Sequence, residues 1–318
     1  MVQELSRRPF LLGSGAFAVL LSAGCHTLGG TIPVDENLSV FLSDIHISGR
    51  NVPGQPTYQN ALLDKVITQV LAMNPRPKRV VVFGDIALWK GIPEDYAESV
   101  PRLQRLVDAG IDLYVTTGNH DHREALFAAY PKQRAITPVP GRVVSVVNLG
   151  TADLLLMDSL KETGGAGKGN AVEGCLDEAQ YAWLLAASQA AKRPFFVGAH
   201  HPIKELTNPK TKKTLLADLQ KMPFFAGYIH GHNHRWMTSW EHVGYKQRHV
   251  NQIVCLPSTG WWGSIGFATM RTSSDKAVLS FAQNDFFFPR PLNEGEARPQ
   301  EWDEIMRQLK DAACVFRF

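Results

Sequence analysis

The 318-residue chain lacks the features that mark several specialised protein classes. It has only four cysteines, none in CxxC spacing, which argues against a zinc ribbon. The net charge is only +3, and no run of five or more like charges occurs, so composition gives no case for nucleic-acid binding. No tandem repeat indicates a solenoid. The apolar fraction of 44% and the charged fraction of 20% are instead typical of a globular protein that buries a full core.

The N-terminus also lacks a long apolar run. The stretch 9–24 is shorter than the roughly 20 apolar residues that a membrane-spanning helix needs. It follows Arg7 and Arg8, and together they resemble a bacterial twin-arginine export signal. We therefore expect residues 1–25 to direct export to the periplasm or cell envelope. The alternatives are an uncleaved membrane anchor or a fortuitous arginine pair.

The end of this segment resembles a lipobox. Cys25 follows Leu21-Ser22-Ala23-Gly24, although Ser22 stands where an aliphatic residue is more usual. A lipid on Cys25 would be the chain's only link to the membrane. The other three cysteines then allow either one disulfide with one leftover thiol or three buried thiols: Cys175, Cys255 and Cys314.

The remaining chain alternates apolar runs with helical patterns. Residues 26–37, with two glycines and a proline, indicate a linker, and residues 38–318 indicate one domain. The alternation predicts a sheet with helices on both sides. The predicted strands are 38–42, 80–83, 113–115, 142–149, 154–157, 195–197, 224–229, 236–240, 249–256, 266–270 and 277–281. The predicted helices are 58–73 with Thr57 as N-cap, 94–109, 123–130, 178–191 with Asp177 as N-cap, 214–221 and 301–312.

After His234 the pattern changes to β-structure, with a hairpin turn at Ser273–Asp275 before the closing helix. We therefore expect an α/β domain (α+β by some schemes) of two facing sheets wrapped by helices. A glycine-rich segment, Lys161–Gly174, is expected to form a mobile loop near the functional site.

Polar residues follow five of the predicted strands directly. They supply carboxylate and carboxamide oxygens together with imidazole nitrogens, which are the ligands of a two-metal hydrolase. In α/β proteins ligands bind at the carboxyl ends of the strands, so these residues should meet at one edge. The five groups are Asp44-Ile45-His46, Gly84-Asp85, Gly118-Asn119-His120-Asp121, His200-His201-Pro202 and Gly231-His232-Asn233-His234.

In this order the five motifs resemble the calcineurin-like metallophosphoesterases over roughly residues 38–260. The resemblance implies a four-layer sandwich of two facing mixed β-sheets flanked by helices. It also implies that Asp44, His46 and His234 hold one metal ion. The second ion would be held by Asn119, His200 and His232, with Asp85 bridging the pair.

The chemistry implied by this resemblance is hydrolysis by a hydroxide that bridges the two ions. Carboxylate and imidazole ligands suit Mn, Fe or Zn. Bound metal lowers the pKa of water, so the hydroxide forms at neutral pH. His120, beside a ligand but not itself one, would stabilise the transition state or protonate the leaving oxygen.

The other histidines have a plainer interpretation. A lone histidine is more often a structural residue than a ligand. Eight of the eleven histidines nevertheless lie at these strand ends, which argues against chance clustering. His122, His201 and Asp121 are expected to support the ligands or contact substrate. The roles of His200 and His201 are interchangeable from sequence, although the family's His-x-Pro pattern favours His200.

Departures from the family pattern argue against two of its subfamilies. Purple acid phosphatases have a tyrosine where this chain has Leu88, so an Fe(III) charge-transfer site is not expected. Phosphoprotein phosphatases have an arginine that Ile86–Gly91 lacks. The segments Gly118–Leu126, Glu178–Trp183 and Val197–Pro202 resemble the class III cyclic nucleotide and glycerophosphodiester phosphodiesterases.

The resemblance therefore implies cleavage of a small phosphodiester. The alternatives are a phosphomonoesterase that scavenges phosphate and a metal-free binding scaffold. Nuclease activity on single strands is not expected, because the sequence shows no signature of a basic and aromatic groove. Trp261 and Trp262 either line the pocket or belong to the core, and we favour the core.

Overall fold

The computed structural model describes residues 32–49, 52, 54, 57–241, 251–288, 309 and 312–318. The predicted export signal with its lipobox at Cys25 lies outside the described residues, as does most of the predicted helix 301–312. Residues 32–318 form one compact unit. No helix in the described part of the chain has both the length and the apolarity to cross a membrane.

The first sheet combines three parallel and three antiparallel strands. Its order is β12-β11-β10-β1-β2-β3, in which β1, β2 and β3 are parallel and the other three form antiparallel pairs. The bounds are β1 Val34–Leu42, β2 Arg76–Phe83, β3 Asp112–Thr116, β10 Gly263–Thr272, β11 Lys276–Phe288 and β12 Ala313–Arg317.

The second sheet has a parallel centre and antiparallel edges. Its order is β4-β5-β6-β7-β9-β8, with β5, β6, β7 and β9 parallel and β4 and β8 antiparallel at the two ends. The bounds are β4 Ser145–Asn148, β5 Asp153–Leu156, β6 Phe195–Ala199, β7 Phe225–His230, β8 Met237–Glu241 and β9 Asn251–Cys255.

The two sheets face each other across an apolar core. The second half of β2, Val80–Phe83, and the strand β6 are continuous apolar runs because they are buried on both faces. From the first sheet Phe41 and Phe83 enter this layer, and from the second Phe196 and Ile229. The predicted pair of facing mixed sheets is therefore confirmed.

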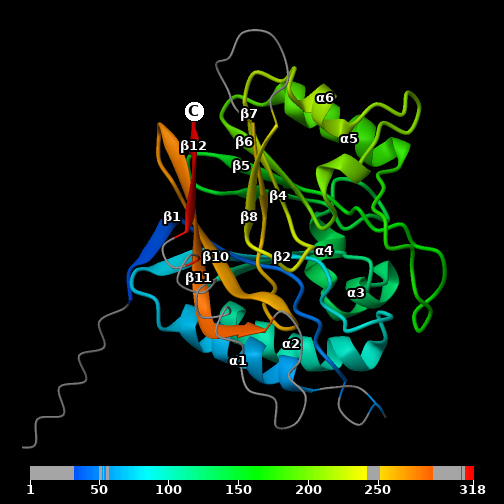
Figure 1. The fold of residues 1–318 in the computed structure, drawn as a ribbon, viewed down its shortest axis with the longest axis vertical. Helices are drawn as coiled ribbons and strands as arrows, with labels where there is room; N and C mark the ends of the chain where they lie inside the picture. Colours follow the sequence, from blue (N-terminus) through cyan, green and yellow to red (C-terminus); the bar gives the residue numbers. More distant parts are fainter. Residues whose placement is uncertain are drawn as a thin grey trace, which may run out of the picture. The chain divides into compact units, whose positions relative to one another are not determined.

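Helices cover the outer face of each sheet (Figure 1). Leu63 and Leu103 bring α1 and α2 onto the first sheet, and Leu184 and Leu219 bring α5 and α6 onto the second. The expectation of helices on both sides of one sheet is wrong, because the inner face is occupied by the other sheet. The helix bounds are α1 Tyr58–Leu71, α2 Pro93–Asp108, α3 Arg123–Ala129, α4 Pro131–Ile136, α5 Glu178–Ala190 and α6 Leu215–Leu219.

Several predicted boundaries need correction. Strand β1 begins at Val34, inside the predicted linker 26–37, because it pairs with β2 from that residue. The short helix α4 and the last strand β12 were not predicted. The hairpin turn is confirmed, since Ser273 N donates to Lys276 O. Asp177 caps α5 by accepting from Gln180 N at 2.8 Å, whereas the Thr57 side chain makes no such bond.

The three cysteines in the described region are free thiols, so the disulfide alternative is wrong. Cys255 and Cys314 are buried, and Cys175 is partly buried. Burial raises the pKa of Cys255 to about 12 and that of Cys314 to about 12. Both thiols therefore stay protonated at neutral pH and serve as small core residues.

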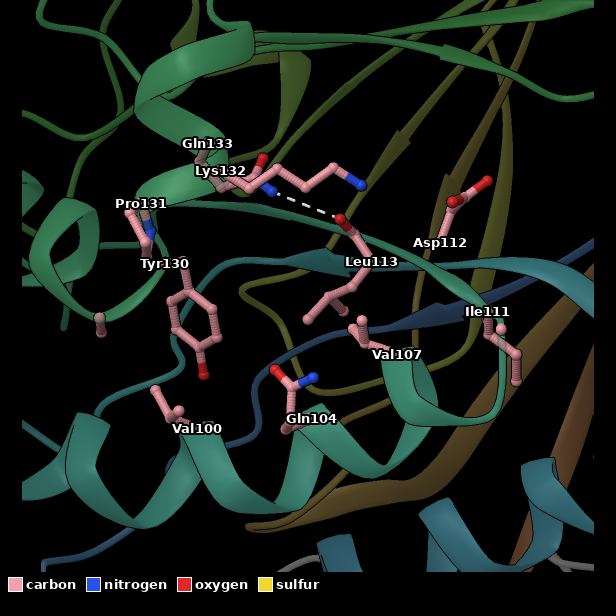
Figure 2. A pocket seen from close by; sticks show the side chains of 12 residues that line it. Val100, Gln104, Val107, Ile111, Asp112, Leu113, Tyr130, Pro131, Lys132 and Gln133 are labelled. Atoms are coloured by element: carbon pink, nitrogen blue, oxygen red, sulfur yellow. Dashed lines mark hydrogen bonds between the residues drawn. The ribbon is translucent and has the colours of Figure 1, made fainter.

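One cavity of about 320 Å³ lies between α2, the start of β3 and α4 (Figure 2). Val100, Ile111 and Tyr130 contribute to its walls. At its edge Gln133 Nε2 donates to Leu113 O at 3.3 Å. None of the candidate metal ligands lines this cavity, so its position does not connect it with the chemistry predicted above.

Candidate metal centre

The predicted ligands meet at the carboxyl ends of parallel strands from both sheets. The loops after β1 and β2 run side by side, because Asp44 N donates to Gly84 O and His46 N to Asp85 O. The loops after β6 and β7 are joined in the same way, since Gly231 N donates to His200 O. The fold thus brings residues more than 180 positions apart in the sequence to one place, as the strand-end pattern predicted.

One group of side chains comes from the loops after β1 and β7. Asp44, His46 and His234 are all buried and present atoms close enough to hold one ion. The Nε2 atom of His234 lies 3.2 Å from Asp44 Oδ1 and 3.1 Å from His46 Nε2. These are the three residues expected to hold the first metal.

A second group comes from the loops after β3, β6 and β7. Asn119 Oδ1 lies 3.2 Å from His200 Nε2 and 3.1 Å from His232 Nδ1. The two imidazole nitrogens are themselves 3.3 Å apart. The three residues expected to hold the second metal therefore converge as well.

Asp85 lies between the two groups. Its Oδ2 atom is 3.2 Å from His200 Nε2 in the second group and 3.6 Å from His46 Nε2 in the first. Its Oδ1 atom accepts a hydrogen bond from the backbone N–H of His120 at 2.8 Å. One carboxylate oxygen is thus fixed by the backbone, while the other faces both groups.

The hydrogen bonds of the imidazole rings fit metal binding. His46 Nδ1 lies 3.1 Å from Leu88 O, and His200 Nδ1 lies 2.8 Å from Phe83 O. A carbonyl can only accept, so each Nδ1 carries the hydrogen when the ring is neutral. The Nε2 atoms that face the centre then have free lone pairs, which is the form in which histidine binds a metal.

Electrostatics at the centre also favour a cation. Burial lowers the pKa of His46 to about 3, which keeps this ring neutral. Burial alone would lower the pKa of His200, but the charges of Asp85 and Asp44 raise it to about 9. Burial alone would raise the pKa of Asp85, but neighbouring His200 and His120 hold it well below the usual range. Two buried carboxylates therefore create a negative field that a metal ion would neutralise.

The backbone around the centre is strained. Asp44, His46, Asp85, His232 and His234 all have positive φ, between 49° and 69°. Such a conformation costs on the order of 1–3 kcal/mol per residue and persists only where the surroundings enforce it. Lys212 is the one other non-glycine residue with positive φ in the described part of the chain. Strain is thus concentrated at the candidate ligands.

Two glycines of the motifs are required by close packing. A Cβ atom at Gly118 would lie 2.1 Å from Asp85 Oδ1, and one at Gly231 would lie 1.9 Å from Ser43 Oγ. Any larger residue at either position would displace a candidate ligand, directly at Asp85 or through Ser43, whose hydroxyl donates to Asp44 Oδ2 at 2.6 Å. These contacts explain why glycine precedes the ligands in these motifs.

Asp121 supports the loops rather than facing a substrate. It is fully buried, and its oxygens accept from Ala87 N at 3.0 Å and Gly118 N at 2.9 Å. The Tyr96 hydroxyl donates to it at 2.9 Å. Asp121 thereby joins the loop that carries Asp85 to the loop that carries Asn119.

His122 connects the centre to the glycine-rich segment 161–174. Its Nδ1 lies 2.8 Å from Glu162 Oε1, and its Nε2 lies 2.9 Å from Lys168 O. Within the same segment Asn170 Nδ2 donates to the carbonyl of Asn119 at 3.0 Å and to that of Asp121 at 2.8 Å. The predicted nearness of this segment to the site is confirmed.

His201 lies behind the second group. Its Nδ1 is 2.8 Å from Ser159 Oγ, and its Nε2 is buried without a hydrogen-bond partner in the described structure. Its ring lies 4.9 Å from the rings of His200 and His232, close enough to count with them as ligating atoms. However, it is His200 Nε2 that reaches both Asp85 and Asn119, which favours His200 as the ligand.

The core assignment of Trp261 is wrong. Its ring lies 4.4 Å from that of His46 and is only partly buried, so it borders the metal centre. Trp262 lies 4.4 Å from His234. Trp89, which is 43% exposed and 5.5 Å from His120, was not singled out from sequence. Its position four residues after Asp85 was the available signal.

Comparison with known proteins agrees with this geometry. The family model for calcineurin-like phosphoesterases matches residues 39–236, more than half of the chain. The chain belongs to the calcineurin-like phosphoesterase family. No curated protein matches the sequence.

Several solved structures resemble this one at low sequence identity. A dimetal phosphatase from Danio rerio has 14% identity and a TM-score of 0.55, covering 77% of this chain and 95% of that one. A purple acid phosphatase from yellow lupin (Lupinus luteus) seeds has 11% identity and a TM-score of 0.49, covering 78% and 51%. A 5'-nucleotidase from Candida albicans has 13% identity and a TM-score of 0.45, covering 88% and 58%. As a calcineurin-like phosphoesterase, the chain has a fold that typically binds two divalent metals, and its clusters of histidine and aspartate fit such a site.

Proposed function

We propose that this calcineurin-like phosphoesterase hydrolyses a small phosphodiester with two transition-metal ions. The observation that carries the proposal is the position of Asp85 Oδ2, between His46 Nε2 and His200 Nε2. One ion would be held by Asp44, His46 and His234, the other by Asn119, His200 and His232, and both by Asp85. The nitrogen and oxygen donors suit Mn, Fe or Zn.

The metal ions, when bound, would supply a water-derived nucleophile at neutral pH and polarise the phosphoryl oxygens. The protein's own contribution would be to fix the ligands and to move a proton. His120 is proposed as the general acid for the leaving oxygen. Its Nε2 lies 3.9 Å from Asp85 Oδ2, and its side chain is 20% exposed, so it reaches the centre without being enclosed by it.

The charge balance around the centre supports a diester substrate. Among the described residues, no hydrogen bond or ion pair joins a lysine or arginine to the seven candidate ligands. The nearby Arg123 is committed to Asp158 and Glu162. A phosphodiester carries one negative charge, whereas a monoester carries up to two near neutral pH. Candidate ligands with no bonded lysine or arginine suit the less charged ester.

The sequence supports the same choice. The segment Gly118–Leu126 resembles class III cyclic nucleotide and glycerophosphodiester phosphodiesterases. Leu88 occupies the place of the purple acid phosphatase tyrosine. The Danio rerio phosphatase shares only the fold at 14% identity and does not decide between diester and monoester.

The test is hydrolysis of bis(4-nitrophenyl) phosphate against 4-nitrophenyl phosphate by protein loaded separately with Mn, Fe or Zn. We expect a higher kcat/KM for the diester with at least one metal, and no turnover by Asp85→Asn. Higher kcat/KM for the monoester with every metal would make the protein a phosphomonoesterase. No turnover of either ester by metal-loaded protein would favour a binding scaffold.

We also propose that the enzyme works outside the cytoplasm. The support is the sequence alone: Arg7 and Arg8 before a short apolar stretch, and the lipobox-like residues ending at Cys25. A lipid on Cys25 would tether the enzyme to the cell envelope, and the substrate would be a small phosphoester of that compartment rather than a nucleic acid.

A further inference from the structure

We infer that Trp89 and Trp261 form a binding surface for a planar aromatic group of the substrate; the inference rests on the proposed phosphodiesterase function. Trp89 follows β2 in the loop that carries Asp85, and Trp261 follows β9. Their rings lie 4.5 Å apart at 89°. Two indoles that meet at a right angle form a corner, in which a flat ring can stack on one and present its edge to the other.

The backbone that carries the two indoles is bonded to the loops of the metal centre. Leu88, directly before Trp89, accepts from His46 Nδ1 and donates its N–H to Asp95 Oδ2 at 3.1 Å. Trp261 N donates to Ser258 Oγ at 3.0 Å, and that hydroxyl donates to Asp44 O at 2.9 Å. The backbone on both sides of the corner is therefore fixed before a ligand binds, which reduces the ordering that binding requires.

The position of the corner identifies the part of the substrate that it would contact. The Trp89 ring lies 5.5 Å from the His120 ring, and the Trp261 ring lies 6.2 Å from it. Because His120 is proposed to protonate the leaving oxygen, the group attached to that oxygen would depart beside Trp89. The corner therefore favours esters whose leaving group carries a flat ring, such as a nucleobase or an aryl group.

The exposure of Trp89 supports a binding role. A tryptophan that served only the core would be covered, but Trp89 is 43% exposed while its neighbours Ala87 and Leu88 are fully buried. Exposed apolar surface beside a catalytic centre is typical of a ligand-binding wall. Stacking of one aromatic base on such a side chain contributes about 1–3 kcal/mol, which corresponds to roughly 5- to 150-fold in affinity.

The test is equilibrium binding of three phosphonates to the Mn-loaded protein by calorimetry: phenyl-, cyclohexyl- and methylphosphonate. All three present the same anionic head to the metals, while only the first carries a flat ring. We expect phenylphosphonate to bind about tenfold more tightly than methylphosphonate and several-fold more tightly than cyclohexylphosphonate. Trp89→Ala should abolish this order, and Trp89→Phe should retain most of it.

Phe224→Ala is the matched control, because Phe224 is 38% exposed but precedes β7, at the opposite end of the strand from the centre. Phe224→Ala should leave the relative affinities for the three phosphonates unchanged. Equal affinities of wild-type protein for the phenyl and methyl compounds would overturn the inference. Equal affinities for the phenyl and cyclohexyl compounds would also overturn it, in favour of a general apolar surface for acyl chains. If the protein hydrolyses diesters but does not bind the phenyl compound more tightly than the other two, the proposed function stands and only the aromatic site is ruled out.

Discussion

The backbone N–H of His120 donates a 2.8 Å hydrogen bond to Oδ1 of Asp85. This bond joins the proposed general acid to the proposed bridging ligand through the main chain. It leaves Oδ2 of Asp85 to face His46 and His200. The fold therefore holds the His120 backbone beside Asp85. In the proposed mechanism the His120 imidazole acts on the substrate rather than as a metal ligand, although its position beside His46 and Asp85 would also allow it to contact an ion.

This arrangement predicts that His120→Ala keeps its metals but loses rate. Turnover should fall by about 10²- to 10⁴-fold if His120 is a general acid. The loss should be largest for diesters with poorly acidic leaving groups and small for nitrophenyl esters, whose leaving group departs unaided. Measuring kcat/KM across a series of leaving groups checks this. An equal loss across the series would indicate electrostatic stabilisation instead, and loss of metal would show that His120 is a ligand.

Arg123 pairs with a buried carboxylate, and its removal should lower the free energy of unfolding. Its Nε lies 2.7 Å from Asp158 Oδ2, and Asp158 is completely buried. Arg123→Ala would leave that carboxylate without its cation, so the free energy of unfolding should fall by about 3–5 kcal/mol. Urea denaturation in a buffer of fixed metal concentration measures this loss in the free energy of unfolding. Arg134→Ala, which breaks an exposed pair with Glu124, is the control and should cost less than about 1 kcal/mol. Similar losses in both variants would contradict the account.

Asp177 gives a prediction for pH dependence. Burial alone would raise its pKa, but the N–H of Gln180 and the charge of Arg142 lower it below the ordinary 3.8. A carboxyl with a lowered folded pKa stabilises the fold above its unfolded pKa, and this is lost as the pH falls through the folded pKa. Asp177→Ala should thus destabilise the protein by about 1 kcal/mol at pH 7.

The difference between wild type and Asp177→Ala should stay constant from pH 7 to pH 5 and decline only below the ordinary carboxyl pKa of 3.8. Denaturant unfolding at several pH values measures it. Asp177→Asn, which keeps a neutral acceptor at the N-cap, should lose less than the alanine variant. A difference that already disappears between pH 7 and pH 5 would show that Asp177 is not held in its ionised form.

The sequence was informative about the site because each candidate ligand directly follows an apolar strand. Strand ends are readable as hydrophobic runs, and parallel strands bring their carboxyl ends to one edge. The strained backbone at Asp44 and His46 was not readable, since it arises from the packing of neighbouring loops. Trp261 was misassigned for a related reason. An indole beside a metal centre and an indole in a core have the same local sequence pattern.

The chain's last strand shows a second limit. Strand β12 has alternating burial over only Ala313–Arg317 and is formed by pairing with β11. A five-residue alternation at the end of a chain gives little local signal, and the pairing depends on residues distant in sequence. The extent of β1 was missed similarly, because Val34 is exposed and joins the sheet through its backbone.

The export proposal is tested by substitutions in the N-terminal segment. Arg7→Lys with Arg8→Lys should leave the precursor in the cytoplasm, because a twin-arginine receptor reads that pair. Fractionation of cells that express the full chain measures it. Cys25→Ala should release the exported protein from membranes. Normal export of the double variant would indicate another route, and unchanged membrane association of Cys25→Ala would contradict lipidation.

The central claim is that seven side chains hold two metal ions with Asp85 between them. Elemental analysis by mass spectrometry of the full chain, folded and purified without chelator, tests it most directly. The account predicts close to two transition-metal ions per wild-type chain and a clear loss of that occupancy in Asp85→Asn, with the fold retained by circular dichroism. A folded wild-type protein that contains no transition metal, and takes up none when supplied with Mn, Fe or Zn, would contradict it.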